Sequence, residues 1–489
     1  MTITRPTRAP QSLRQAWIAL AGLSAVFLFE MLDNSILTVA LPTIGRDLHA
    51  SATSLQWVTG IYAVVFGGLM LVFGSIADRF GRRRLMLVGL VLLALASLGT
   101  AFVTTAGELI AVRALMGVAA AMTTPGSIAL AFRLFDDDGL RVRGMNLMTT
   151  IGLVGLAIAP TLGGLVLAVA PWQALLLVNV PVAVLAFVGI RVGIPVDDRA
   201  ELHDDPLDVA GAVLGTATIV LALVTPTLFV EQGAASWMPW TATAATALLA
   251  VAFLLRERSA AHPMLDLALV ARPLVASGLA YKAATGLAMA GLGYLVTLQL
   301  QLDWGWPPAL AALGLLPQVA VLLASGPFVS PFLRRVGFDG AAWMSAAAVV
   351  AGLAVYTVLG GLGYSWVALT LALVAVGLRF NGVIAGTNVM RGLPDNRTSM
   401  GAALVDTSSE VATAVGVAVT GTVLASLFTG TITATPWTAQ QSSQFQQAVT
   451  TGGAVLTIVA AALVGGALIR TRLATARDAA AGSAEPTAI

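Results

Sequence analysis

The sequence lacks cysteine and has little charge and little histidine. Without cysteine the 489-residue chain can form no disulfide, thiolate metal site or thiol nucleophile. His49, His203 and His262 stand far apart, without the spacing of metal ligands. Charged residues make up 10% of the chain, whereas a soluble domain has roughly 25%. The net charge of +2 gives no reason to expect a nucleic-acid partner. Lipid is therefore the expected solvent of this chain.

Long apolar runs recur along the whole sequence. Each is about long enough to cross a hydrocarbon core ~30 Å thick as a helix. Helix is required there because lipid offers the backbone no hydrogen-bond partners. The first run extends past signal-peptide length and lacks a small-residue cleavage pattern, so we expect it to remain as the first helix. We predict an all-α membrane protein with fourteen spans: Ala16–Ala40, Leu55–Ala77, Leu85–Val103, Gly107–Ala131, Met145–Val169, Trp172–Ile190, Leu207–Phe229, Met238–Leu255, Leu274–Leu298, Ala309–Val329, Ala341–Leu359, Ser365–Val389, Gly401–Leu427 and Gly453–Ile469.

The basic residues support an even number of spans with both termini in the cytoplasm. Cytoplasmic loops are rich in Lys and Arg, and this arrangement places 22 of the 26 basic residues on the inner side. Only Arg46 lies outside, while Arg113, Lys282 and Arg379 lie within spans. Nearly all of the positive charge is arginine, which is typical of a GC-rich bacterial genome. We therefore expect a multi-pass protein of the bacterial cell (inner) membrane.

A weak internal repeat suggests two related halves. Gly74–Arg83 follows the second span and Gly326–Arg335 follows the tenth, with Gly, Phe and paired Arg at the same offsets. Repeated halves are characteristic of secondary transporters. The acidic stretch Asp197–Asp208 is interpreted as a solvated linker rather than a cation site. The expected organisation is a tail (1–15), a six-helix bundle (16–190), an acidic cytoplasmic linker (191–206), two inserted spans (207–255), a second linker (256–273), a second six-helix bundle (274–469) and a disordered cytoplasmic tail (470–489).

The loop after the second span is the most specific local pattern. It reads GSIADRFGRRR and resembles the signature loop of the major facilitator superfamily, G-x-x-x-D-R-x-G-R-R/K. The resemblance implies the major facilitator fold and a conformational-switch role for this loop. The residues concerned are Gly74, Asp78, Arg79, Gly81, Arg82 and Arg83. By charge alone, the loop can equally be a topology anchor held inside by its arginines.

Further motifs narrow the resemblance to the fourteen-helix drug:proton antiporters. Leu32–Pro42 looks like their LDxTIVNVALP motif, and Arg113 with Gly117 matches their RxxxG motif. The fifth span is similar to their antiporter motif GxxxGPxxGG through Gly155, Pro160, Gly163 and Gly164, with Ala159 in place of a glycine. Pro160 and these glycines predict a kink and a seam of small residues.

The ionisable residues inside the spans are the expected functional core, because each costs a few kcal/mol at mid-span. Asp33 and Arg113 lie at matching depths from the outer ends of their spans, so we predict that they meet. Arginine favours the charged form of a carboxylate and burial favours the neutral form, so such a site can load and release a proton. The alternative is a static ion pair. Glu30 shares a face with Asp33 and is either a second proton site or hydrogen-bonded packing.

Asp406 and Glu410 lie four residues apart on one face of the thirteenth span. This resembles the quaternary-ammonium and multidrug exporters, which carry paired acids there. The pair is interpreted as a second site for protons or cationic substrate, or alternatively Glu410 forms a structural pair with Arg379. Lys282 is expected to extend to the cytoplasmic surface rather than to contact substrate. Those exporters often carry a further acid in the second span, where this chain has Gly60.

Together these patterns predict a proton-coupled antiporter that exports hydrophobic, cationic drugs or toxic compounds by alternating access. The proton-motive force is the expected drive, with no cofactor, no metal and no catalytic residue. The expected partners are the substrate, protons and the lipid bilayer, with no nucleic acid, and the protein is expected to act as a monomer. The alternative on the same fold is a dedicated exporter of one endogenous metabolite, lipid or antibiotic. A membrane enzyme or channel is disfavoured, because no catalytic set or selectivity-filter segment is found.

Overall fold

The computed structural model describes residues 10–135, 137–197, 208–233, 235–260, 267–393, 398–430, 432 and 437–482. Within these ranges every regular element is a helix, which confirms the predicted fold class. Contacts divide the chain into two compact units. The first draws its described residues from Met1–Ala212 and Trp306–Leu313, and the second from Val213–Gly305 and Gly314–Ile489.

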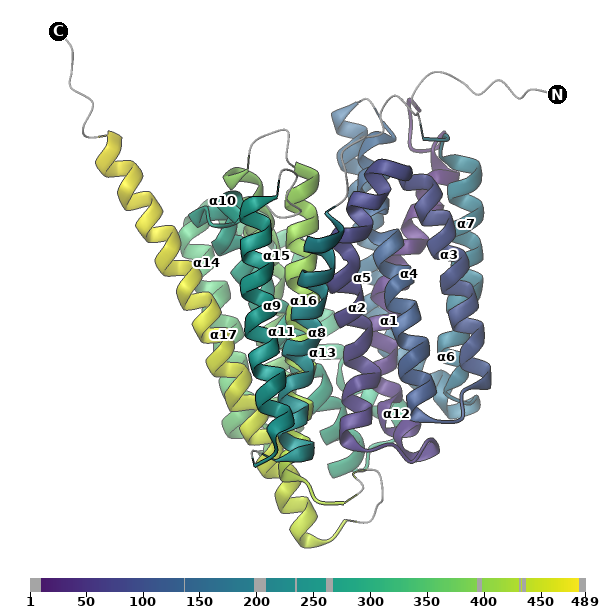
Figure 1. The fold of residues 1–489 in the computed structure, drawn as a ribbon, viewed down its shortest axis with the longest axis vertical. Helices are drawn as coiled ribbons and strands as arrows, with labels where there is room; N and C mark the ends of the chain where they lie inside the picture. Colours follow the sequence, from purple (N-terminus) through teal and green to yellow (C-terminus); the bar gives the residue numbers. More distant parts are fainter. Residues whose placement is uncertain are drawn as a thin grey trace. The chain divides into compact units, whose positions relative to one another are not determined.

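The first unit is organised around α1. Its helices are α1 (Trp17–Asp47), α2 (Ala52–Phe80), α3 (Arg82–Gly99), η1 (Thr100–Phe102), α4 (Ala106–Arg133), α5 (Asp138–Val169), α6 (Gln173–Leu177), α7 (Asn179–Gly193) and most of α12 (Pro308–Gly314). α1 packs along α5 and α7 and also contacts α4, while α2 pairs with α4 (Figure 1). The backbones of α1 and α7 nearly touch, because a Cβ on Gly189 would lie 2.6 Å from the Cα of Gly22. This central position lets the buried acids of α1 contact α4 and α7.

The second unit is organised around α11. Its helices are α8 (Val209–Gln232, from Val213 onward), α9 (Trp237–Ser259), α10 (Leu267–Val270), α11 (Pro273–Leu298), the π-helical η3 (Gln299–Asp303), α13 (Leu316–Ala324), α14 (Gly326–Leu359), η4 (Gly360–Leu362), α15 (Tyr364–Gly392), α16 (Thr398–Leu427) and α17 (Ala439–Gly482). α11 packs along α15, α16 and α17. Tyr281 of α11 lies in an apolar cluster with Phe380 of α15 and Val464 of α17.

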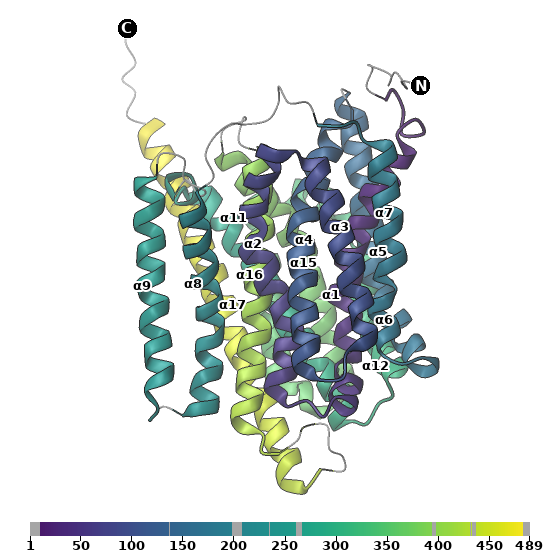
Figure 2. The same cartoon turned by 45° about the vertical axis from the view of Figure 1, so that its right-hand side comes forward.

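The helices α8 and α9 stand side by side as an antiparallel pair (Figure 2). Near the turn, the rings of Phe229 and Trp240 meet edge-on with centroids 5.1 Å apart. Near the other end, Phe253 packs against Gly215, whose missing side chain leaves room for the ring. Only 11% of the most apolar stretch of α9 is buried, as expected of a helix that faces lipid. The domain boundaries expected around this pair stay a prediction.

Membrane-length helices account for most of the predicted spans. Among the described residues, ten helices are long and apolar enough to cross a bilayer, or twelve if the bent helices α1 and α5 each count as one span. The two remaining predicted spans coincide with shorter apolar stretches, Val209–Ala222 and Pro308–Ala324. The exact number of fourteen stays a prediction.

The tenth expected span is not one continuous helix. α12 ends at Gly314 and α13 begins at Leu316, with Pro317 in its first turn. A proline clashes with the carbonyl four residues before it, which separates the two helices at this point. The first segment of the internal repeat contains a glycine with positive φ, Gly81 at 102°. Near the second segment the glycine with positive φ is Gly337 at 77°, which lies two residues beyond Arg335.

The last helix runs further than the predicted span, while the expected disorder of the C-terminal tail stays a prediction. α17 continues through Gly482, well beyond the end predicted at Ile469. Alanine, arginine and leucine dominate this stretch and are strong helix formers, and no proline interrupts it. The rest of the predicted tail, 483–489, lies outside the described residues.

Candidate functional site

The predicted meeting of Asp33 and Arg113 is confirmed in the first unit. Nη1 of Arg113 on α4 forms an ion pair with Oδ2 of Asp33 on α1. The two side chains are 0% and 1% exposed, so solvent does not screen the pair. Since an unpaired charge is costly inside a membrane helix, each residue makes the burial of the other possible.

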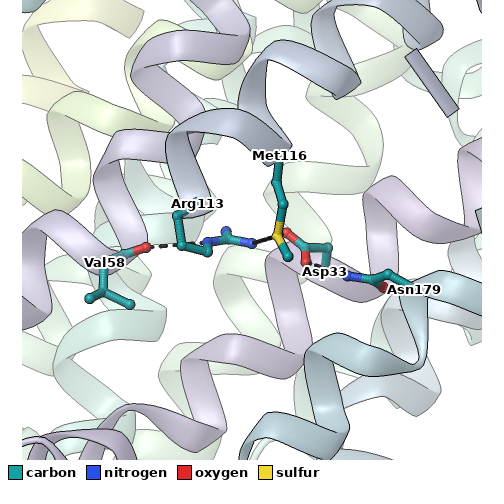
Figure 3. Close-up of polar contacts among 5 residues, drawn as sticks. All are labelled: Asp33, Val58, Arg113, Met116 and Asn179. Atoms are coloured by element: carbon teal, nitrogen blue, oxygen red, sulfur yellow. Dashed lines mark hydrogen bonds and ion pairs between the residues drawn. The ribbon is translucent and has the colours of Figure 1, made fainter. Parts of the chain in front are cut away.

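Two further helices, α7 and α2, complete the surroundings of this pair (Figure 3). The amide Nδ2 of Asn179 on α7 donates to the second carboxylate oxygen of Asp33 over 3.0 Å. Nε of Arg113 donates to the backbone carbonyl of Val58 on α2 over 3.3 Å. The guanidinium also lies over the ring of Tyr62, 4.6 Å from its centroid, and near the sulfur of Met116. Both oxygens of the carboxylate are therefore held, one by a cation and one by a neutral amide.

A bend in α1 falls directly after this acid. The segments Trp17–Asp33 and Ile36–Asp47 meet at 45°. Asp33 thus lies at the end of the first segment, where its carboxylate contacts α4 and α7. A change in the protonation of the Asp33 carboxylate would therefore occur next to the bend in α1.

Glu30 lies one turn before Asp33 on α1. It is 7% exposed, and Oγ1 of Thr124 on α4 donates to its Oε2 over 3.1 Å. Its carboxylate is therefore engaged in hydrogen-bonded packing in this structure. Whether Glu30 also carries a proton stays a prediction.

The glycines of the antiporter motif on α5 line the helix surface that faces α1. A Cβ on Gly155 would lie 2.5 Å from Cδ1 of Leu28, and one on Gly163 would lie 2.8 Å from Cγ1 of Ile36. Gly164 instead faces α12, where a Cβ would lie 2.7 Å from the Cα of Ala309. Pro160 lies inside α5, whose two halves are bent by 41° between Leu156 and Ile158. The predicted kink and small-residue seam are both present.

The signature loop joins α2 to α3 through a glycine turn. Gly81 has φ 102°, a backbone conformation that favours glycine. Gly74 lies in α2 with open space beside it, and Arg79 is exposed next to the ring of Phe80. Arg82 opens α3. The side chain of Asp78 lies outside the described side chains.

Arg83 and Asp197 connect this loop to the chain after α7. Arg83 is 7% exposed, and its Nη2 donates to the backbone carbonyl of Arg191 over 2.7 Å. The carboxylate of Asp197 accepts hydrogen bonds from the backbone amides of Arg83 and Arg84 over 3.3 and 3.4 Å. An acid at this position accepts hydrogen bonds from amides that the first turn of α3 leaves unpaired. Its negative charge also interacts favourably with the positive end of the helix dipole. Asp197 was expected to be a solvated linker residue, and that interpretation is wrong for this position.

The second unit holds the acid pair predicted on the thirteenth span, here α16. Glu410 is 9% exposed and its Oε2 receives no hydrogen bond, while Asp406 is half-buried. Arg379 on α15 has a buried Nε without an acceptor. Among the described residues no ion pair joins Arg379 to Glu410, so the structure does not support the static-pair alternative. The two acids lie close enough for the charge of Asp406 to act on Glu410.

Lys282 on α11 belongs to the same region of the second unit. Its side chain is half-buried, and its charge acts on both Asp406 and Glu410. Whether Lys282 also extends towards the cytoplasmic surface stays a prediction. The acid pair therefore has a cationic neighbour that the sequence pattern did not assign to it.

Asn179 is the site residue that the sequence analysis missed. A signal for it was present, because Asn179 lies seven residues after Trp172, the outer end of its predicted span. The same depth count had already placed Asp33 and Arg113 opposite each other. An uncharged polar residue in an apolar run is easily overlooked when only charges are searched.

The fold and these buried charges define a polytopic membrane protein whose helical bundles hold ionisable groups away from water. The chain belongs to the Major Facilitator Superfamily, whose family model matches residues 23–417.

Two curated relatives illustrate the similarity. The chain is 30% identical over 321 residues to the methyl viologen resistance protein SmvA of Salmonella typhimurium, a match that covers 66% of this chain and 64% of SmvA. It is 28% identical over 428 residues to the multidrug efflux pump LfrA of Mycolicibacterium smegmatis, covering 86% of this chain and 83% of LfrA. The alignment with SmvA thus spans a little under two thirds of that protein.

A solved structure supports the fold. A bacterial homologue of the human lysosomal transporter Spinster matches with a TM-score of 0.67 over 94% of this chain and 98% of its own. The sequence identity is 13%, so the likeness concerns the fold alone.

Proposed function

We propose that this protein is a proton-coupled antiporter that exports hydrophobic, cationic compounds from the cytoplasm by alternating access. The observation that carries the proposal is the fully buried carboxylate of Asp33, held by Arg113 and Asn179 inside the membrane-spanning helices. Such a carboxylate must be compensated while it is charged and needs no counter-charge once it is protonated. Its partners can therefore rearrange when a proton arrives.

In this proposal, the acids of the second unit bind the proton or the cationic substrate. Glu410 is deeply buried and lacks a partner for Oε2, so it is available to a proton or to a cationic group of the substrate. In each cycle, a substrate entering from the inside displaces or competes with the proton, and reprotonation from the outside resets the transporter.

The proton gradient supplies the energy for this cycle. One charge moved across 100 mV is worth about 2.3 kcal/mol, and a tenfold proton gradient adds about 1.4 kcal/mol.

The relatives support an efflux role. The printed names of SmvA and LfrA refer to methyl viologen resistance and multidrug efflux. The proposal places the protein in a bacterial inner membrane with both termini in the cytoplasm, acting as a monomer on small substrates. It works as a transporter rather than an enzyme and requires no cofactor or nucleic acid.

The test is the replacement Asp33→Asn in purified protein reconstituted into liposomes. The amide cannot exchange a proton, so we expect substrate-driven proton release to fall to the level of empty liposomes. Asp47→Asn is the matched control on the same helix. Asp47 is exposed and accepts a hydrogen bond from Nε1 of Trp172, which an amide oxygen can also accept. Full proton release by Asp33→Asn would exclude Asp33 as the coupling acid.

A further inference from the structure

α11 and α16 lie in backbone contact where the acid pair is found. A Cβ added to Gly286 of α11 would lie only 2.6 Å from the backbone oxygen of Ser409 on α16. Oγ of Ser408 donates to the backbone carbonyl of Leu279 over 2.9 Å. Side chains between these contacts on the two facing surfaces have little room to separate.

Lys282 and Asp406 lie on these facing surfaces. Lys282 follows Leu279 by three residues and precedes Gly286 by four, so all three share one face of α11. Asp406 precedes Ser409 by three residues on α16, which places it on the face that meets α11. The charge of Lys282 acts on Asp406 and also on Glu410, one turn further along.

Lys282, Asp406 and Glu410 interact through their charges but form no direct ion pair among the described residues. Within the described part of the chain, no ion pair joins Lys282 to either acid, and Oε2 of Glu410 receives no hydrogen bond. Within the same described residues, no ion pair joins Arg379 to either acid. When all three groups are ionised, two carboxylates and one ammonium leave a net charge of −1.

We infer that Lys282 is a built-in counter-cation that limits this site to one further positive charge, so that the exported substrate is a monovalent lipophilic cation. The inference rests on the proposed function and specifies its substrate class. Two carboxylates without a cation are costly in a medium of low polarity, and Lys282 lowers that cost while the site is empty. A monovalent cation or one proton then completes neutrality, whereas a divalent cation would leave an excess positive charge beside the ammonium of Lys282.

The test compares the binding of two probes, monovalent tetraphenylphosphonium and divalent methyl viologen, to the full-length protein in detergent at neutral pH. Wild type is expected to bind tetraphenylphosphonium more tightly. Lys282→Gln removes the ammonium and raises the site charge to −2. Its preference should move towards methyl viologen on the order of tenfold, because one repelling charge within the site is gone.

Three further variants separate charge from packing. Lys282→Arg keeps the charge and should retain the wild-type preference. Lys282→Met removes the charge with an apolar side chain and should behave like Lys282→Gln, which covers the case in which one of them does not fold. The double variant Lys282→Gln with Glu410→Gln returns the site to −1 and should restore the preference for the monovalent probe, which a purely structural role of Lys282 would not predict.

Two results overturn the inference. One is an unchanged preference in folded Lys282→Gln or Lys282→Met, and the other is a wild-type preference for methyl viologen. Failure of the proposed function gives a different pattern, in which wild type in liposomes moves neither probe in exchange for protons.

Discussion

At the scale of single residues, the two groups of buried acids differ in how many of their carboxylate oxygens have a partner. Asp33 has a partner at each oxygen, a guanidinium from α4 and an amide from α7. Glu410 is almost as buried but leaves Oε2 without a donor. A fully satisfied carboxylate favours a defined arrangement of helices, whereas an unsatisfied one is free to bind a ligand. We therefore assign the conformational response to the first group and ligand capture to the second.

Asn179 offers a direct test of the first assignment. Asn179→Leu removes the hydrogen bond from α7 to the charged Asp33, and a bond to a charged group contributes about 1.5–3 kcal/mol. We expect a lower unfolding temperature in detergent micelles and weaker transport. The same replacement should cost much less in an Asp33→Asn background, where the charge is already gone. Equal costs in both backgrounds would mean that Asn179 acts through packing and not through Asp33.

At the scale of helices, glycine contacts determine how closely the elements approach. The surface of α5 that faces α1 is formed by glycines opposite Leu28 and Ile36, and α12 meets the same helix at Gly164. The contacts differ in kind, because Gly155 faces the tip of a flexible side chain while Gly164 faces the backbone of α12. A side-chain tip can move aside, whereas a backbone atom moves only with its whole helix.

This difference predicts a ranking of three equivalent replacements. Gly164→Ala should lower the free energy of unfolding by about 1–3 kcal/mol, the cost typical of overpacking. Gly155→Ala should cost less, because Leu28 can adopt another rotamer. Gly465→Ala in α17 has no atom within 4 Å of the added carbon and should be neutral or stabilising by up to about 1 kcal/mol. Thermal unfolding of the three purified variants measures the order, and a larger loss at Gly465 than at Gly164 would contradict it.

Part of this architecture follows directly from the sequence. Runs of apolar residues indicated the helices, and counting residues from the outer end of each span predicted the contact between Asp33 and Arg113. Both inferences depend on the fixed rise of a helix and the thickness of a bilayer, which act locally along the chain. The motif glycines likewise predicted a seam of small residues on α5, but not that α1 packs against it.

Other features depend on tertiary contacts that spacing alone does not reveal. Asp197 contacts the start of α3 from more than a hundred residues away, and nothing in its acidic neighbourhood distinguishes it from solvated residues. Lys282 approaches the acids because Gly286 lets α11 meet α16, a consequence of packing rather than of hydropathy. The break at Gly314 and Pro317 was visible in the sequence, but a count of apolar residues does not register it.

At the scale of the whole molecule, the central claim is that a cation and a proton compete for the same buried carboxylates. The two units each supply one group of buried acids: Asp33 is paired with Arg113 in the first, and Oε2 of Glu410 receives no hydrogen bond in the second. The most direct measurement is the number of protons released when saturating substrate is added to purified protein in weakly buffered detergent solution. Our account predicts that about one proton is released per bound cation near neutral pH. It predicts no release from the triple variant Asp33→Asn, Asp406→Asn and Glu410→Gln. Substrate binding that releases no proton from wild type, or the same number from the amidated variant, would contradict it.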